Sequence, residues 1–164
     1  MDYKRLSLIK KNVYGWLTTK INESDYTVGE GAGEVKFTNA FPKIDDEGNF
    51  LEIAMPAVAL DFSRNNARKS EEMGVACNYR VEFEIDIFAR NELERETLLS
   101  IIKDALELGS IPYRDYNSVV EITPLLSYLR VSTPDAIPIR KSGPGILEEN
   151  RGRLFFSVSL LQDY

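Results

Sequence analysis

The chain has 164 residues, with 20 Lys and Arg against 26 Asp and Glu, for a formal net charge of −6. This length predicts one domain over residues 1–164, large enough to bury a core without disulfide bonds. The acidic balance argues against a protein whose whole surface binds nucleic acid, because phosphate binding requires a basic footprint.

The sequence contains no histidine and one cysteine, Cys77. An intramolecular disulfide is therefore excluded, a structural zinc site is disfavoured, and the commonest general acid–base side chain is missing. No apolar run reaches the roughly 18 residues that span a bilayer, and the charged N-terminal segment has no apolar core typical of a signal peptide. We expect a soluble intracellular protein without membrane contact and without a cofactor.

Residues 3–21 are predicted to form a docking helix. Apolar side chains recur every three or four residues, while basic residues lie elsewhere around the cylinder and indicate a solvated side. The apolar set is Leu6, Ile9, Val13, Trp16, Leu17 and Ile21, and the basic set is Lys4, Arg5, Lys10, Lys11 and Lys20. Residues 22–34 hold three glycines and several acids, which predicts a mobile loop.

The next segments are predicted to be extended. Residues 35–41 and 50–53 form a hairpin around an acidic turn whose spacing fails the calcium-loop pattern. Residues 53–63 form a strand in which Pro56 indicates an edge or a bulge. A polar connection follows, and its basic cluster of Arg64, Arg68 and Lys69 is interpreted as a solvated loop or as a docking contact to an acidic partner.

A strand over residues 78–89 is the most informative element. Its side chains alternate between an apolar face, with Tyr79, Val81, Phe83, Ile85 and Ile87, and a charged face, with Arg80, Glu82, Glu84 and Asp86. The strand is long for a small domain, so part of it is expected to project past the core. The carboxylates are catalytic, form a surface facing another charged body, or serve solubility.

A helix follows directly. Asn91 is the predicted N-cap, Glu94 completes a capping box, and Gly109 with Pro112 ends the helix. Leu98, Ile101, Ile102 and Ala105, flanked by Leu93 and Leu106, form the expected buried side. Two further strands are predicted over 119–131 and 153–161. The segment 133–152, with its prolines and glycines, is expected to be a flexible or functional loop.

A catalytic site is poorly supported by these residues. A metal-dependent nuclease could use Glu82, Glu84 and Asp86 together with Asp61 on a neighbouring strand. However, alternate residues on one strand are roughly 7 Å apart, and no Glu-x-Lys pattern accompanies them. Cys77 has no histidine partner and is expected to be a small, buried or partly buried side chain. We therefore expect a protein that is not an enzyme.

The passage YRVEFEIDIFARNELERETLLSIIKDAL, residues 79–106, and the order of the elements around it resemble the tail terminator, neck or tail-completion proteins of long-tailed bacteriophages. The resemblance implies an α/β (α+β) domain with a mostly antiparallel sheet flanked by two main helices. It implies a structural virion protein, made in the host cytoplasm, that forms a ring, expected to be hexameric, at the head–tail junction.

Such a ring would terminate the tail tube, join it to the head-side connector, and let DNA pass through its lumen without sequence-specific binding. On this resemblance Glu82, Glu84 and Asp86 are the lumen-facing candidates, since like charges repeated around a channel repel DNA. Arg64, Arg68, Lys69, Arg140 and Lys141 are the partner-contact candidates, and loops 22–34 and 133–152 would reach neighbouring subunits. The nuclease, and a binding module of unknown ligand, remain the alternatives.

Overall fold

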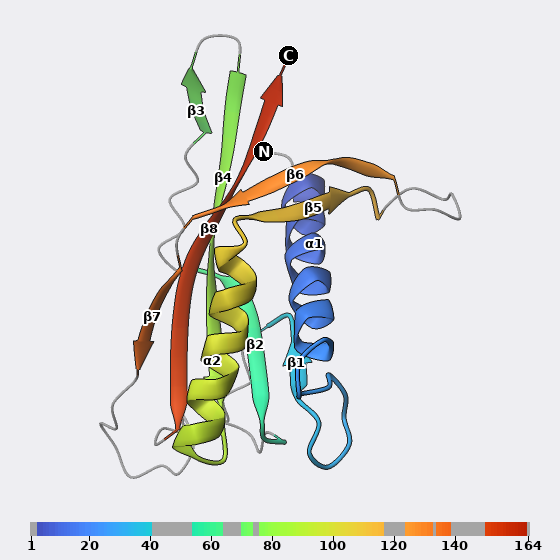
Figure 1. Cartoon of the computed structure of the whole chain (residues 1–164). Coiled ribbons are helices and arrows are strands. Elements are labelled where there is room, and N and C mark those ends of the chain that lie inside the picture. The colour runs from blue at the N-terminus through green and yellow to red at the C-terminus, as the bar shows by residue number, and fades with distance from the viewer. Residues whose placement is uncertain are drawn as a thin grey trace, which may run out of the picture.

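The computed structural model describes residues 3–40, 54–63, 70–73, 76–116, 124–132, 134–138 and 150–163. Over these ranges the chain forms two helices packed on one face of a curled, mostly antiparallel sheet (Figure 1), so the expected α+β class is confirmed. The helices are α1 (Tyr3–Asn22) and α2 (Glu92–Glu107). The strands are β1 (Lys36–Thr38), β2 (Ala57–Phe62), β3 (Ser70–Met73), β4 (Ala76–Phe88), β5 (Ser110–Arg114), β6 (Leu125–Val131), β7 (Asp135–Pro138) and β8 (Arg151–Asp163).

The sheet is built around the pairing of β4 with β8. These two strands pair antiparallel over their full length, from Ala76↔Asp163 to Phe88↔Arg151. The main strand order is β1-β2-β4-β8-β6-β5, with β3 added to β4 and β7 added to β8. Only β1 and β2 pair in parallel among the described strands. In Figure 1, the start of β4 and the end of β8 continue past both helices at one end of the molecule, as expected from the length of the strand.

Helix α1 packs on the sheet through the apolar stripe expected from its sequence. Leu6, Ile9, Val13, Leu17 and Ile21 are buried, whereas Trp16 is only partly buried. The helix is tied to β1 by Tyr14, whose ring stacks on Phe37 at 4.4 Å between centroids and whose hydroxyl donates to the Phe37 carbonyl. Burial of each such side chain contributes roughly 1.5–3 kcal/mol, so this helix is anchored by packing.

Helix α2 begins and ends at the predicted residues. The Asn91 side chain accepts from the Glu94 amide at 2.9 Å, and Gly109 takes a left-handed φ of +81° after the last turn. In a capping box, the Glu94 carboxylate would accept from the amide of the N-cap residue Asn91. In the structure it accepts from the amide of Arg90, one residue earlier. Leu98, Leu99, Ile102, Ala105 and Leu106 form the buried side. Leu93, which was expected beside them, is exposed.

The strand predictions differ from the structure in several details. Strand β1 pairs in parallel with β2, and its expected hairpin partner, residues 50–53, lies outside the described residues. Strand β2 starts after Pro56 and is flanked by β1 and β4 at Ala57, so its first residues are not an edge. Strand β5 was not expected at all. It tolerates Pro112 because its described ladder runs only to β6, and an edge strand can lack one amide donor.

The 133–152 segment is likewise not one loop. Its residues 135–138 form β7, paired with β8 at positions such as Asp135↔Phe155, and β8 already begins at Arg151. The predicted strand over 119–131 is confirmed from Leu125 onward. In the described part of the chain no helix is sufficiently long and apolar to cross a membrane.

Candidate functional site on the outer face of the sheet

The acidic residues of β4 lie on the sheet face opposite the helices, as the alternation predicts. Val81, Phe83, Ile85 and Ile87 are fully buried in the core beneath α1 and α2. The side chains between them face outward, where antiparallel register places each beside one residue of β8. The outward pairs are Arg80↔Ser159, Glu82↔Ser157, Glu84↔Phe155, Asp86↔Arg153 and Phe88↔Arg151.

Two arginines of β8 neutralise Glu84 and Asp86, the two carboxylates of this face nearest the C-terminal end of β4. Arg153 donates from Nε to Asp86 Oδ1 at 2.8 Å, and the same nitrogen lies 2.7 Å from Glu84 Oε1. Arg151 donates from Nη2 to Asp86 Oδ2 and lies over the Phe88 ring. Two carboxylates and two guanidinium groups therefore form a charge-balanced cluster, which we call the Asp86 cluster.

The Asp86 cluster is largely withdrawn from solvent. Asp86 is 0% exposed and Glu84 is 5% exposed. The hydrogen bond to Asp86 is the largest cause that raises the pKa of Arg153 above its ordinary value, and burial acts in the opposite direction. A buried carboxylate is tolerated in a protein only when it is paired and hydrogen-bonded. Asp86 and Glu84 meet that condition.

This geometry corrects the description of the strand as an open acidic surface. Of the three lumen-facing candidates, only Glu82 is partly exposed, beside the exposed Arg80. Glu84 and Asp86 are buried and paired with guanidinium groups. Around the described residues, no group of three or more acidic, cysteine or histidine side chains is arranged to hold a metal ion. Asp61, the expected fourth carboxylate, instead pairs with Lys10 of α1 at 2.8 Å.

The sequence did contain a signal for the Asp86 cluster. Arg151 and Arg153 alternate in RGRLFF as Glu84 and Asp86 alternate in EFEID. Two strands with complementary charges at period two place those charges on one face when they pair in antiparallel register. The last strand was predicted to start at residue 153, which left Arg151 in a loop. The complementary charge pattern of the two strands was therefore not recognised.

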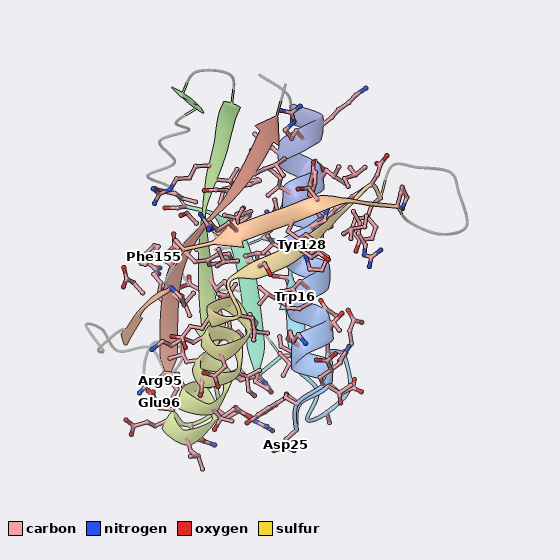
Figure 2. The ribbon with its side chains drawn as sticks, turned by 45° about the horizontal axis from the view of Figure 1, so that its top comes forward. Trp16, Asp25, Arg95, Glu96, Tyr128 and Phe155 are labelled. Atoms are coloured by element: carbon pink, nitrogen blue, oxygen red, sulfur yellow. The ribbon has the colours of Figure 1, made fainter. Side chains whose placement is uncertain are left out.

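A polar hollow of about 620 Å³ lies above the Asp86 cluster on the same face. Phe155 of β8, labelled in Figure 2, contributes an aromatic wall between charged and hydroxyl side chains. The polar side chains that line the hollow are those of Ser63, Arg80, Glu82, Ser132, Asp135 and Ser157. Ser132 and Ser157 are already bonded to each other at 3.0 Å, with the Ser157 amide also donating to Ser132 Oγ. Those two hydroxyls therefore hold β8 to the segment after β6.

Apolar side chains are exposed on the ribbon formed by β5 and β6. In Figure 1 this ribbon crosses the N-terminal half of α1 and runs on beyond it. Its inward residues, such as Ile111 and Leu129, are buried, but Leu126 and Tyr128 on the outward side are 54% and 56% exposed. Leu125 and Tyr116 are exposed nearby. Leu126 and Tyr128 share one side of β6, and exposed apolar side chains that gather in this way are typical of interaction surfaces.

The 22–34 loop, expected to be mobile, has its own hydrogen bonds. Val28 forms a single bridge with Val35, the Val28 amide donates to the Asn22 side chain, and the Gly31 amide donates to Glu34. Figure 2 shows Asp25 of this loop at the same end of the molecule as Arg95 and Glu96 of α2. The partner-contact candidates Arg64, Arg68, Lys69, Arg140 and Lys141 lie outside the described residues.

No protein-family model matches the chain, and no curated protein is significantly similar to it. The class defined here is therefore that of the fold, an α+β domain with two helices on one face of a curled sheet.

Proposed function

We propose that this chain is a structural subunit of a ring at the head–tail junction of a long-tailed bacteriophage. In this function the ring terminates the tail tube, joins it to the head-side connector and surrounds the DNA path. The observation that carries the proposal is the exposed apolar side of the β5–β6 ribbon at Leu126 and Tyr128. Such a surface is unfavourable in water and fits a subunit that functions in contact with other protein chains.

The shape of the subunit also supports assembly. Strands β4 and β8 extend beyond the helices, and the β5–β6 ribbon extends sideways over α1 (Figure 1), so both reach past the subunit's own core. The projecting end of β4 is itself paired with both β3 and β8, so the projection extends the sheet as a whole. The resemblance of the strand-to-helix passage over residues 79–106 to tail terminators gives this assembly its biological setting.

The Asp86 cluster changes which residues could line a channel. Because Glu84 and Asp86 are paired with Arg151 and Arg153, they contribute little net field toward DNA. Among the described residues of β4, Arg80 and Glu82 would present charge to a lumen. We therefore restrict the proposed lining role on this face to Glu82.

The nuclease alternative loses its support at the same residues. A two-metal or one-metal nuclease needs carboxylate oxygens that are free to coordinate the ion. In this subunit the oxygens of Asp86 and Glu84 bond to guanidinium groups, which occupy the positions a cation would take. The binding-module alternative still has a candidate site in the polar hollow beside Phe155. The lining of that hollow mixes both signs of charge, so it does not indicate a class of ligand.

The proposal is tested by the mass and shape of the isolated protein in solution. Light scattering over a concentration series should show a closed oligomer of fixed copy number, and negative-stain images should show rings with a central opening. A strict monomer at high concentration would argue strongly against the proposal. Incubation with supercoiled plasmid and Mg²⁺ or Mn²⁺ should leave the DNA intact, and cleavage that vanishes in Glu84→Gln would establish the nuclease instead.

A further inference from the structure

The two helices carry opposite charge on their exposed sides. Helix α1 holds five cations and no carboxylate, whereas α2 holds five carboxylates, one lysine and one arginine. On α1, Lys4, Ser7 and Lys11 are exposed and follow a spacing of three and four residues, so they form one stripe. On α2 the exposed side is formed by Glu92, Leu93, Glu96, Ser100, Lys103, Asp104 and Glu107.

The dipole of α1 does not account for this distribution. Cations in the first turn of a helix oppose its dipole, yet α1 begins with Lys4 and Arg5 and has no acid there. The two helices lie side by side in Figure 1. Even so, the ion pairs of Lys10 and Lys20 run to Asp61 and Glu23, and those of Lys103 and Arg95 stay within α2. Arg95 and Lys103 therefore compensate part of the acidic charge of α2, but five carboxylates against two cations still leave α2 net negative beside a net positive α1.

Each charged side is accompanied by exposed apolar side chains. In Figure 1 the β5–β6 ribbon crosses the N-terminal half of α1, the half that carries the exposed Lys4 and Lys11. The ribbon adds exposed Leu126, Tyr128 and Arg130, and we call these five residues the basic surface. Exposed leucines lie at the two ends of α2, with Leu93 in its first turn at 77% and Leu108 at its C-cap at 64%. Together with Glu96, Asp104 and Glu107 they form what we call the α2 outer face. Aromatic and arginine side chains beside a small apolar patch are typical of interface centres.

We propose that the basic surface of one copy docks on the α2 outer face of a second copy of this chain. The opposite charges steer the two copies together and fix their register, while the exposed leucines and Tyr128 lose their contact with water. The two surfaces differ, so the contact can repeat from copy to copy and close into a ring. This inference rests on the proposed self-assembly and specifies the contact that carries it.

Charge reversal on each surface tests the contact. Lys4→Glu with Lys11→Glu makes the basic surface acidic, and Asp104→Lys with Glu107→Lys makes the α2 outer face basic. Each pair of changes should raise the concentration needed for assembly at least tenfold, since like charges then face each other. Lys11→Glu alone should weaken assembly, whereas Arg80→Glu, with the same charge change on the opposite sheet face, should leave the helix contact intact.

The decisive measurement is the equimolar mixture of the two reversed proteins. In an alternating arrangement every contact again joins opposite charges, so native mass spectrometry should show mixed oligomers at a concentration where each variant alone is monomeric. Circular dichroism of each variant alone confirms the fold. Wild-type assembly should also weaken as salt shortens the screening length from about 10 Å near 0.1 M.

Failure of this contact is distinguishable from failure of the proposed function. If wild-type rings form and persist in both reversed variants, the contact is wrong and the ring stands. If wild type forms dimers or open fibres and the mixture restores them, the contact is right and the ring is wrong. A mixture that stays monomeric while wild type assembles overturns the contact, and a wild type that never assembles overturns both.

Discussion

Asn12 of α1 and Arg114 of β5 form a two-way hydrogen-bonded link through the Asn12 side chain and the Arg114 backbone. Asn12 Nδ2 donates to the Arg114 carbonyl at 3.0 Å, and the Arg114 amide donates to Asn12 Oδ1 at 2.8 Å. The amide side chain thus supplies the donor and acceptor that a neighbouring strand would offer. The link closes this part of the β5 edge and positions the ribbon over α1.

Replacing Asn12 with leucine should destabilise the protein by about 2–3 kcal/mol. Asn12 is buried, and the substitution leaves the Arg114 amide and carbonyl without these partners, each at a cost of about 1–3 kcal/mol before relaxation. Urea unfolding followed by circular dichroism measures the change. Thr19→Ala is a matched control, because the Thr19 hydroxyl bonds only within its own helix and is exposed. Equal stability of the two variants would contradict a structural role for the link.

Breaking the Asp86 cluster should cost more than any change on the exposed part of the same face. Asp86→Ala leaves two guanidinium groups without their shared acceptor, and removal of one partner from a buried pair costs about 3–5 kcal/mol. Glu82→Ala, on the partly exposed part of the strand, should change stability by about 0.5 kcal/mol or less. Denaturant midpoints at neutral pH compare the two. A midpoint for Asp86→Ala close to that of Glu82→Ala would show that the cluster contributes little.

The start of α2 should make stability depend on pH in the acidic range. The hydrogen bond from Arg90 is the largest cause that lowers the pKa of Glu94 below its ordinary value of 4.5. Ionised Glu94 therefore stabilises the folded protein above that ordinary value, and this contribution is lost as the pH falls through the lowered pKa.

The free energy of unfolding should consequently fall on acidification below about pH 5, and the fall should be shallower in Glu94→Gln. Arg90→Gln should flatten the profile in the same way, and combining both changes should add little, since they remove one interaction. Unfolding curves at successive pH values supply the test. Profiles for Glu94→Gln and wild type that run parallel would assign the acid sensitivity to other groups.

Gly152 permits the close approach of α2 to β8. A Cβ at this position would lie 2.9 Å from Leu99 Cδ1 and 3.3 Å from Arg95 Cγ, both closer than ordinary contact. Gly152→Ala should destabilise the protein by about 1–2 kcal/mol through overpacking. Adding Leu99→Ala should cost less in the Gly152→Ala background than in wild type, because the two changes share one space. Strict additivity in this double-mutant cycle would refute the close packing.

The local elements could be read from the sequence because their signals are local. The apolar period of α1, the Asn91 cap and Gly109 stop of α2, and the alternation of β4 each depend on residues within a turn or two of one another. Strand β5 escaped prediction because five residues containing Pro112 carry no strand signal of their own. They become a strand through pairing with β6 and the link to Asn12, both of which join distant parts of the chain.

The charged face shows the same division at the candidate site. The sequence by itself determined that Glu82, Glu84 and Asp86 share the face opposite the core, because successive side chains of a strand point to opposite sides. Whether these charges are free was decided only by tertiary structure. The register of β4 with β8 brings Arg153 and Arg151 onto the two lower carboxylates from more than sixty positions away. The alternation of charges on one strand therefore predicts which face of the sheet carries them. The neighbouring strand decides how much of that charge is neutralised.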